Sequence, residues 1–272
     1  MPQLEPAFSP RMTSTPVPPL PPAIAWRQTP LGQYVLAWEQ EKLDMALADV
    51  FGYNALQLGM PEQDFLRANR IALRQTIALP TDARNNVRSP HLLAEFSQLP
   101  IASQSVDLLL LPHVLEFHPE PHQILREAHR ILRPEGRLFI LGFNPLSLWG
   151  LTRSLPGRVR GQPKNGQYLS VLRLRDWLKL LNFEVDRGAF GIYVPPCKSE
   201  TWLRRWHFME LAGDRWWGFT GSVYMLRAIK RVAGMRLILP AWDTGKKLAA
   251  KAFTPATNRT HKEPHEESSY DK

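Results

Sequence analysis

The chain has 272 residues, of which 44% are hydrophobic and 22% charged; this composition can build a globular core and excludes wholesale disorder. Its formal net charge is +9, and its one cysteine, Cys197, excludes an intramolecular disulfide and a multi-thiolate metal site. No stretch reaches the roughly 18 to 20 apolar residues of a membrane helix, and no signal peptide is visible. We therefore expect a soluble, cytoplasmic protein.

The two ends differ in composition from the middle of the chain. Residues 1–25 are rich in proline, and residues 241–272 are rich in lysine, threonine, histidine, glutamate and serine. Such segments have too few apolar residues to form a core. We expect a disordered lead-in at 1–25, one domain over 26–240 and a disordered polar tail at 241–272.

Helical and extended patterns alternate through the first half of that domain. They predict one or two helices over 32–51. Three short strand candidates follow at 54–59, 70–79 and 90–96. The run at 54–59 is apolar and ends in Gly59, which is typical of a buried parallel strand.

The clearest block lies between residues 105 and 143. A continuous apolar strand at 105–111 precedes an amphipathic helix at 120–132, whose end is marked by Arg133-Pro134-Glu135-Gly136. A second buried strand follows at 137–143. This order predicts a right-handed βαβ unit with parallel strands.

The last part of the domain predicts a closing hairpin. A helix at 173–181 leads into strand candidates at 183–192 and 222–232. Two late strands after a helix are consistent with an antiparallel edge on the sheet, so the chain is expected to be an α/β protein.

Four short motifs follow one another over nearly fifty residues. They are Leu99-Pro100-Ile101, Ser105-Val106-Asp107, the helical run from Leu125 to Leu132, and Pro134-Glu135-Gly136. In order and spacing they resemble the C-terminal half of the type-11 methyltransferase domain. The resemblance implies the class I methyltransferase fold, a three-layer Rossmann-like, mostly parallel sheet with an antiparallel last strand, and S-adenosylmethionine (SAM) as cofactor.

The glycine-rich motif of that family is altered here. Gly59 is kept, but Gln57 replaces an acid, and Pro61 and Gln63 replace two glycines. Residues 70–79 contain no acid for the ribose hydroxyls of the cofactor. Two readings follow: the cofactor site is remodelled, or it is lost.

The resemblance implies five cofactor-binding residues: Gln57, Gly59, Glu95, Phe96 and His113. Glu95 would accept a hydrogen bond from the adenine amine, Phe96 would lie beside the ring, and His113 would lie near the mouth of the site as a base or polar anchor. Each has an alternative reading: Gly59 ends a strand, Glu95 is an exposed carboxylate, and His113 has a structural role. For His113 we favour the structural reading.

Histidines and tryptophans offer two further groups of candidate residues. His122 and His129 are seven residues apart rather than the four of a helical zinc pair, so no metal site is expected. The tryptophans between 202 and 217 are expected to form a local core, to cover the site or to contact a partner. They are Trp202, Trp206, Trp216 and Trp217.

Three functions are compatible with these features. The first is a SAM-dependent methyltransferase of unknown acceptor with a divergent cofactor loop. The second is a non-catalytic binding or scaffold protein that keeps the fold. The third is an RNA-associated methyltransferase or binder, suggested by basic runs at 153–164 and 215–236 that contain no acid.

Overall fold

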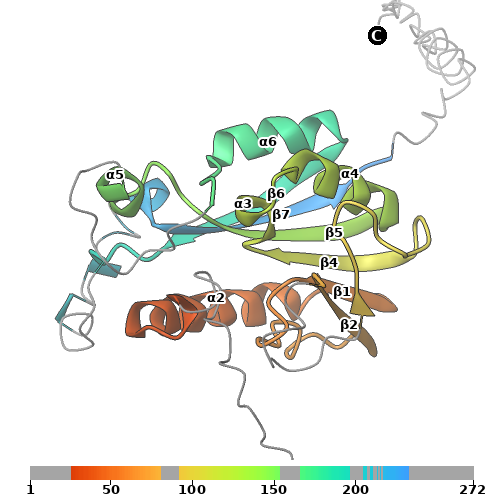
Figure 1. Ribbon diagram of the computed structural model, residues 1–272, viewed down its shortest axis with the longest axis horizontal. Helices are drawn as coiled ribbons and strands as arrows, with labels where there is room; N and C mark the ends of the chain where they lie inside the picture. The colour runs from red at the N-terminus through yellow and green to blue at the C-terminus, as the bar shows by residue number, and fades with distance from the viewer. Residues whose placement is uncertain are drawn as a thin grey trace, which may run out of the picture. The chain divides into compact units, whose positions relative to one another are not determined.

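The computed structural model describes residues 26–80, 92–153, 166–196 and 217–232, together with residues 205, 206, 209, 210, 213 and 215. The predictions for 1–25 and 241–272, and those on Cys197, Trp202 and Trp216, lie outside the described residues. Within the described part, helices cover both faces of a seven-stranded sheet (Figure 1).

The sheet has the strand order β3-β2-β1-β4-β5-β7-β6. Its strands are β1 Asn54–Leu58, β2 Leu73–Ala78, β3 Leu92–Leu93, β4 Val106–Pro112, β5 Leu132–Phe143, β6 Phe183–Gly191 and β7 Val223–Lys230. Strands β1 to β5 pair in parallel, whereas β7 is antiparallel to both β5 and β6. The predicted class I methyltransferase architecture, with its closing hairpin, is confirmed.

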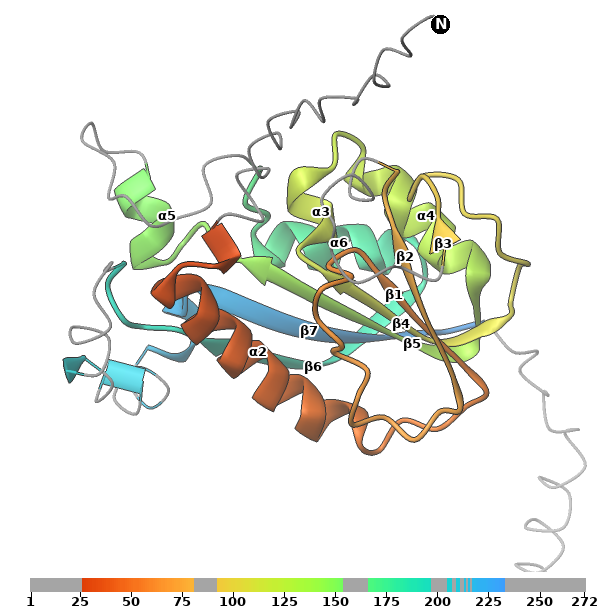
Figure 2. The same ribbon diagram turned by 60° about the horizontal axis from the view of Figure 1, so that its bottom comes forward.

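The helices form the two outer layers. They are α2 Pro30–Leu47, α3 Val114–Phe117, α4 Pro121–Ile131, α5 Leu148–Arg153, α6 Val171–Leu180 and the 3₁₀ helix η2 Gly218–Thr220. Helix α2 lies on one face of the sheet, and α4 and α6 lie on the other (Figures 1 and 2). Thr29 caps the start of α2, accepting a hydrogen bond from the Gly32 N–H, and Pro30 occupies its first turn.

The leucine run of β4 explains why the strand is apolar throughout. Successive side chains of a strand point to opposite faces. Leu108 and Leu110 pack with α2, while Leu109 and Leu111 pack with α4 and α6. All four are fully buried, as a central parallel strand requires.

The βαβ unit differs from its prediction at one boundary. Strand β5 begins at Leu132, not at Arg137, because Leu132 already pairs with Val106 of β4. The stop residues between them form an irregularity inside the strand, where the register shifts and Glu135 adopts a φ of 63°. Helix α4 nevertheless ends at Ile131, as the stop residues predict.

The other strands need smaller corrections. Among the described residues of the candidate at 90–96, Leu92 and Leu93 form a strand, β3. The candidate at 70–79 is a strand, β2, that pairs in register with β1. The pattern at 32–51 is one helix, α2, which ends at Leu47.

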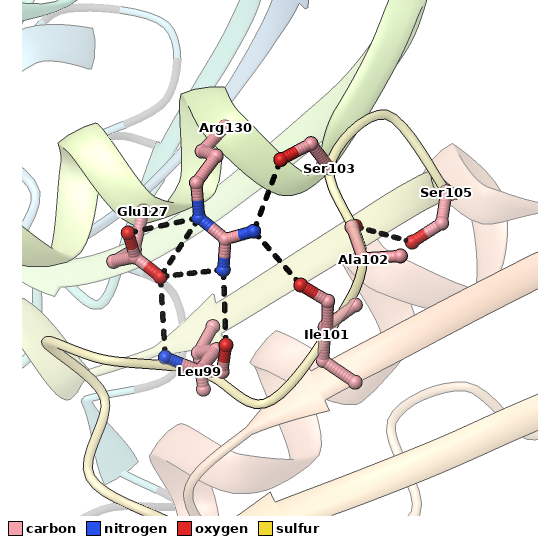
Figure 3. A network of polar contacts seen from close by, with 7 residues as sticks. All are labelled: Leu99, Ile101, Ala102, Ser103, Ser105, Glu127 and Arg130. Atoms are coloured by element: carbon pink, nitrogen blue, oxygen red, sulfur yellow. Dashed lines mark hydrogen bonds and ion pairs between the residues drawn. The ribbon is translucent and has the colours of Figure 1, made fainter.

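A salt-bridged arginine explains why the helical motif is spaced as it is. Figure 3 shows the Arg130 guanidinium donating to the carbonyl oxygens of Leu99 (2.9 Å) and Ile101 (2.8 Å). Glu127 pairs with Arg130 (2.8 Å) and accepts a hydrogen bond from the Leu99 N–H (3.1 Å). The hydrogen bonds from Arg130 are the main reason why the pKa of Glu127 lies below its ordinary value. The pair thus fastens the Leu99-Pro100-Ile101 turn onto α4.

We expect Arg130→Ala to lower the free energy of unfolding by about 1–2 kcal/mol, since it leaves two turn carbonyls without their charged donor at a partly exposed site. Urea denaturation would measure the change. Arg126→Ala, an exposed position on the same helix, is the control and should change stability by less than about 0.5 kcal/mol. Equal effects of the two variants would contradict the role assigned to Arg130.

Candidate functional site

A cavity opens at the carboxyl ends of β1 and β4. From β1 the chain continues to β2 on one side, while β4 lies on the other side, so the strand order reverses here. Open α/β sheets bind ligands at such a point. The cavity has a volume of about 140 Å³ and is lined by Trp26, Arg27, Gly59, Met60, Leu79, Phe96, Pro112, His113, Val114, Phe117, His118 and Phe143.

Gly59 forms the turn directly after β1. Its φ of 79° lies in the left-handed region, and its N–H donates to the carbonyl oxygen of Ile77 (2.7 Å). A Cβ at this position would lie 3.1 Å from Cγ2 of Val114 and 3.8 Å from Cζ of Phe96. The two readings of Gly59 therefore coincide, because it ends the strand and also brings bare backbone to the cavity wall.

Gln57 supports the loop from beneath and is not among the residues that line the cavity. Its buried amide nitrogen donates to the carbonyl oxygens of Gly59 (3.1 Å), Met60 (3.0 Å) and Gln63 (2.9 Å). A carboxylate has no proton to donate to a carbonyl. The amide at this position thus matches a loop whose carbonyl groups turn inward.

Phe96 and Glu95 take different places at the cavity. Phe96 is buried and lines the cavity wall beside Gly59. The Glu95 side chain is 56% exposed and lies outside the lining, but its Oε1 is 3.1 Å from Nε2 of His118, which does line the cavity. Nδ1 of His118 accepts from the Glu120 N–H, so Nε2 is the nitrogen that donates to Glu95.

His113 follows β4 in a left-handed conformation, with a φ of 53°. Its Nε2 lies 2.6 Å from Oε1 of Glu39, its Nδ1 lies 3.0 Å from Oε2 of Glu116, and its ring stacks on Phe143 at 4.3 Å. Burial by itself lowers the pKa of His113, but the two carboxylates outweigh it and raise that pKa to about 10. His113 is therefore an imidazolium at neutral pH, which makes it a polar anchor and not a base.

Comparison with known proteins agrees with this geometry. The sequence model of a family described as a methyltransferase domain matches residues 71–140. The chain is 31% identical over 160 residues to the uncharacterized protein YafS of Escherichia coli, a match that covers 59% of this chain and 65% of that protein. Residues 71–140 thus match a methyltransferase domain family, and the described part of the chain has the class I methyltransferase fold.

Other relatives extend the comparison. Malonyl-[acyl-carrier protein] O-methyltransferase of Laribacter hongkongensis is 31% identical over 97 residues, covering 35% of this chain and 32% of that protein. A SAM-dependent methyltransferase of Thermotoga maritima has a TM-score of 0.55 and 16% identity, over 77% of this chain and 94% of the other. A SAM-dependent methyltransferase from Archaeoglobus fulgidus has a TM-score of 0.50 and 16% identity, and the match covers 72% of this chain and 99% of the other. The chain spans just under two thirds of the first curated relative and about one third of the second.

The two buried carboxylates that contact His113 were not predicted from the sequence. Glu39 lies on α2 and is fully buried; Glu116 lies on α3, where its Oε1 accepts a hydrogen bond from the Phe143 N–H. A signal for Glu39 did exist, because it falls on the same helical stripe as the buried Val35 and Leu43. A charged residue on such a stripe indicates a buried partner.

The tryptophans described by the structure do not share one environment. Trp206 packs against the cluster that contains Trp26 and Trp149, whereas Trp217 is 55% exposed. Glu210, from the same segment, accepts hydrogen bonds from the N–H groups of Ile192 and Tyr193, and burial raises its pKa. For Trp217 the expectation of a local core is wrong.

Two further findings concern the described residues only. They contain no group of three or more histidine, cysteine, aspartate or glutamate side chains placed to hold a metal ion. None of their helices combines the length and the apolar character required to cross a membrane.

The free energy of unfolding should fall as the pH rises above neutral. His113 has a pKa of about 10 when folded against about 6.5 when unfolded. Its stabilising contribution is therefore complete below about pH 6.5 and is lost as the pH approaches 10, at about 1 kcal/mol per pH unit. Urea denaturation between pH 7 and 8.5 would measure this slope.

Glu39→Gln should flatten that slope, because it removes one of the two charges that raise the pKa of His113. Glu41→Gln, an exposed position on the same helix, is the control and should keep it. A slope that is absent from the unaltered protein, or unchanged in Glu39→Gln, would contradict the imidazolium.

Proposed function

We propose that the chain is a SAM-dependent methyltransferase that binds its cofactor in the cavity between the ends of β1 and β4. The observation that carries the proposal is Gly59, whose φ of 79° and missing side chain leave bare backbone at the cavity wall. A Cβ there would enter the space next to Val114 and Phe96. The methyltransferase domain and the position of the cavity at the switch point of the sheet support it.

The residues around the cavity fit the chemistry of the cofactor. Phe96 offers an aromatic face for the adenine ring, and Glu95, with His118, offers polar groups at the same side. The cavity volume of about 140 Å³ is below the roughly 300–1,000 Å³ of typical small-molecule sites. The mouth would therefore widen on binding, or part of the cofactor would lie outside it.

Bound SAM supplies a methyl group on a sulfonium, ready for in-line displacement. The protein then has to bind and orient the cofactor and the acceptor and to exclude water. These contributions to the rate need no proton-transfer residue. His113 fits this division, because a histidine with a pKa of about 10 does not take up a proton at neutral pH. Its role is to hold the wall of the cavity in place.

A non-catalytic protein that keeps the fold is the second candidate. It is favoured by the loop after β1, where Pro61 lacks an N–H and the buried Gln57 amide donates to three loop carbonyl groups.

RNA association stays a prediction. Among the basic residues of 215–236, Arg227 pairs with Asp186, and Lys230 donates to two carbonyl oxygens at the end of α4.

Calorimetric titration of the full chain with SAM and with its demethylated product, S-adenosylhomocysteine, tests the proposal. We expect saturable binding of both and a rise in the melting temperature. Neither heat nor thermal stabilisation at millimolar ligand would overturn it and leave the non-catalytic candidate.

Gly59→Ala should weaken SAM binding by about tenfold or more, since an added methyl group in a tight site costs about 1–3 kcal/mol and here lies 3.1 Å from Val114. Gly218→Ala, where a Cβ meets no atom within 4 Å, is the control and should bind SAM as the unaltered chain does. Circular dichroism would confirm that both variants fold. A folded Gly59→Ala protein with unchanged affinity would place the cofactor elsewhere.

A further inference from the structure

Three titratable side chains form a buried cluster directly behind the cavity wall. The Glu39 side chain is 0% exposed, that of Glu116 is 1% exposed and that of His113 is 7% exposed. Of the three, His113 reaches the cavity lining, between Pro112 and Val114. The cluster joins α2 to the end of β4 and the start of α3.

The charges of this cluster do not cancel. Both ring nitrogens of His113 face carboxylate oxygens, which accept hydrogen bonds but do not donate, so the ring carries both protons. One imidazolium between the two carboxylates leaves a net charge of −1. Glu39 is the less compensated of the two carboxylates, because its Oε2 is buried without a hydrogen-bond partner among the described residues, whereas both oxygens of Glu116 accept one.

The other polar side chains at the cavity do not offset this surplus. Arg27 lines the cavity but pairs with Glu62, and the Nε2 of His118 donates to Glu95. The wall is otherwise rich in aromatic rings, whose faces attract cations. These rings belong to Trp26, Phe96, Phe117 and Phe143. A chain with a net charge of +9 thus places a surplus negative charge behind the wall of this cavity.

A buried cluster with a surplus of negative charge is costly, and a cation nearby reduces that cost. We propose that the Glu39–His113–Glu116 cluster makes the cofactor site selective for charge, so that it favours the cationic sulfonium of SAM over the neutral thioether of S-adenosylhomocysteine. This inference rests on the proposed function. The loss of positive charge on methyl transfer then weakens the hold on the product and aids its release.

Binding titrations of the full chain with SAM, S-adenosylhomocysteine and sinefungin test the inference. In sinefungin a carbon atom that carries an amine replaces the methylated sulfur, so it supplies the positive charge without a transferable methyl group. We expect SAM and sinefungin to bind more tightly than S-adenosylhomocysteine. If the unaltered chain binds S-adenosylhomocysteine as tightly as both cationic ligands, or more tightly, the inference is overturned, and this result needs no variant.

Glu39→Gln removes the surplus charge and keeps the side-chain shape. The preference for SAM over S-adenosylhomocysteine should fall by about tenfold, because one of the charges that attract the cation is removed. The affinity for S-adenosylhomocysteine should change little. Glu41→Gln makes the same change of charge at an exposed position of α2 and should keep the preference.

The outcomes separate this inference from the proposed function. Binding of both ligands, with the same preference in folded Glu39→Gln as in the unaltered chain, overturns the inference alone. An equal loss of preference in Glu41→Gln also overturns it, because a long-range effect would then explain the result. Binding of none of the three ligands to the unaltered chain counts against the proposed function, and the inference falls with it.

Discussion

The imidazolium of His113 is held between Glu39 and Glu116, and through them three layers of structure meet at one point. Glu39 comes from α2 on one face of the sheet, His113 follows the central strand β4, and Glu116 accepts the N–H of Phe143 at the end of β5. Removing one member of a buried ion pair typically costs about 3–5 kcal/mol, because the other charge is left without compensation. The position of the cavity wall therefore depends on all three residues together.

The loop after β1 depends on a second polar contact of the same kind. Its carbonyl groups turn toward the buried amide of Gln57, and Gly59 supplies the left-handed turn that this requires. Neither residue substitutes for the other, since one gives the donor and the other the backbone conformation. The loop thus keeps a defined shape even though Pro61 and Gln63 stand where the related family has glycines.

Two of the elements that shape the cavity lie outside the region that matches the methyltransferase family. Residues 71–140 supply most of the parallel sheet, α3 and α4, including the Glu127–Arg130 pair. Helix α2 with Glu39, and the loop with Gln57 and Gly59, both precede that region. The cavity therefore depends on parts of the chain that the family match does not include.

Local patterns in the sequence determined the helices and strands. The sequence showed the leucine run of β4, the apolar stripe of α4 and the stop residues after it. This was possible because burial repeats with the period of a helix or a strand. Only the tertiary structure decided which residues meet. Glu39 reaches His113 across 74 positions, Glu95 meets His118 instead of lining the cavity, and Leu132 pairs with Val106 to start β5 early. Periodicity records that a side chain is buried but not its partner, and the chemistry of this site lies in the partners.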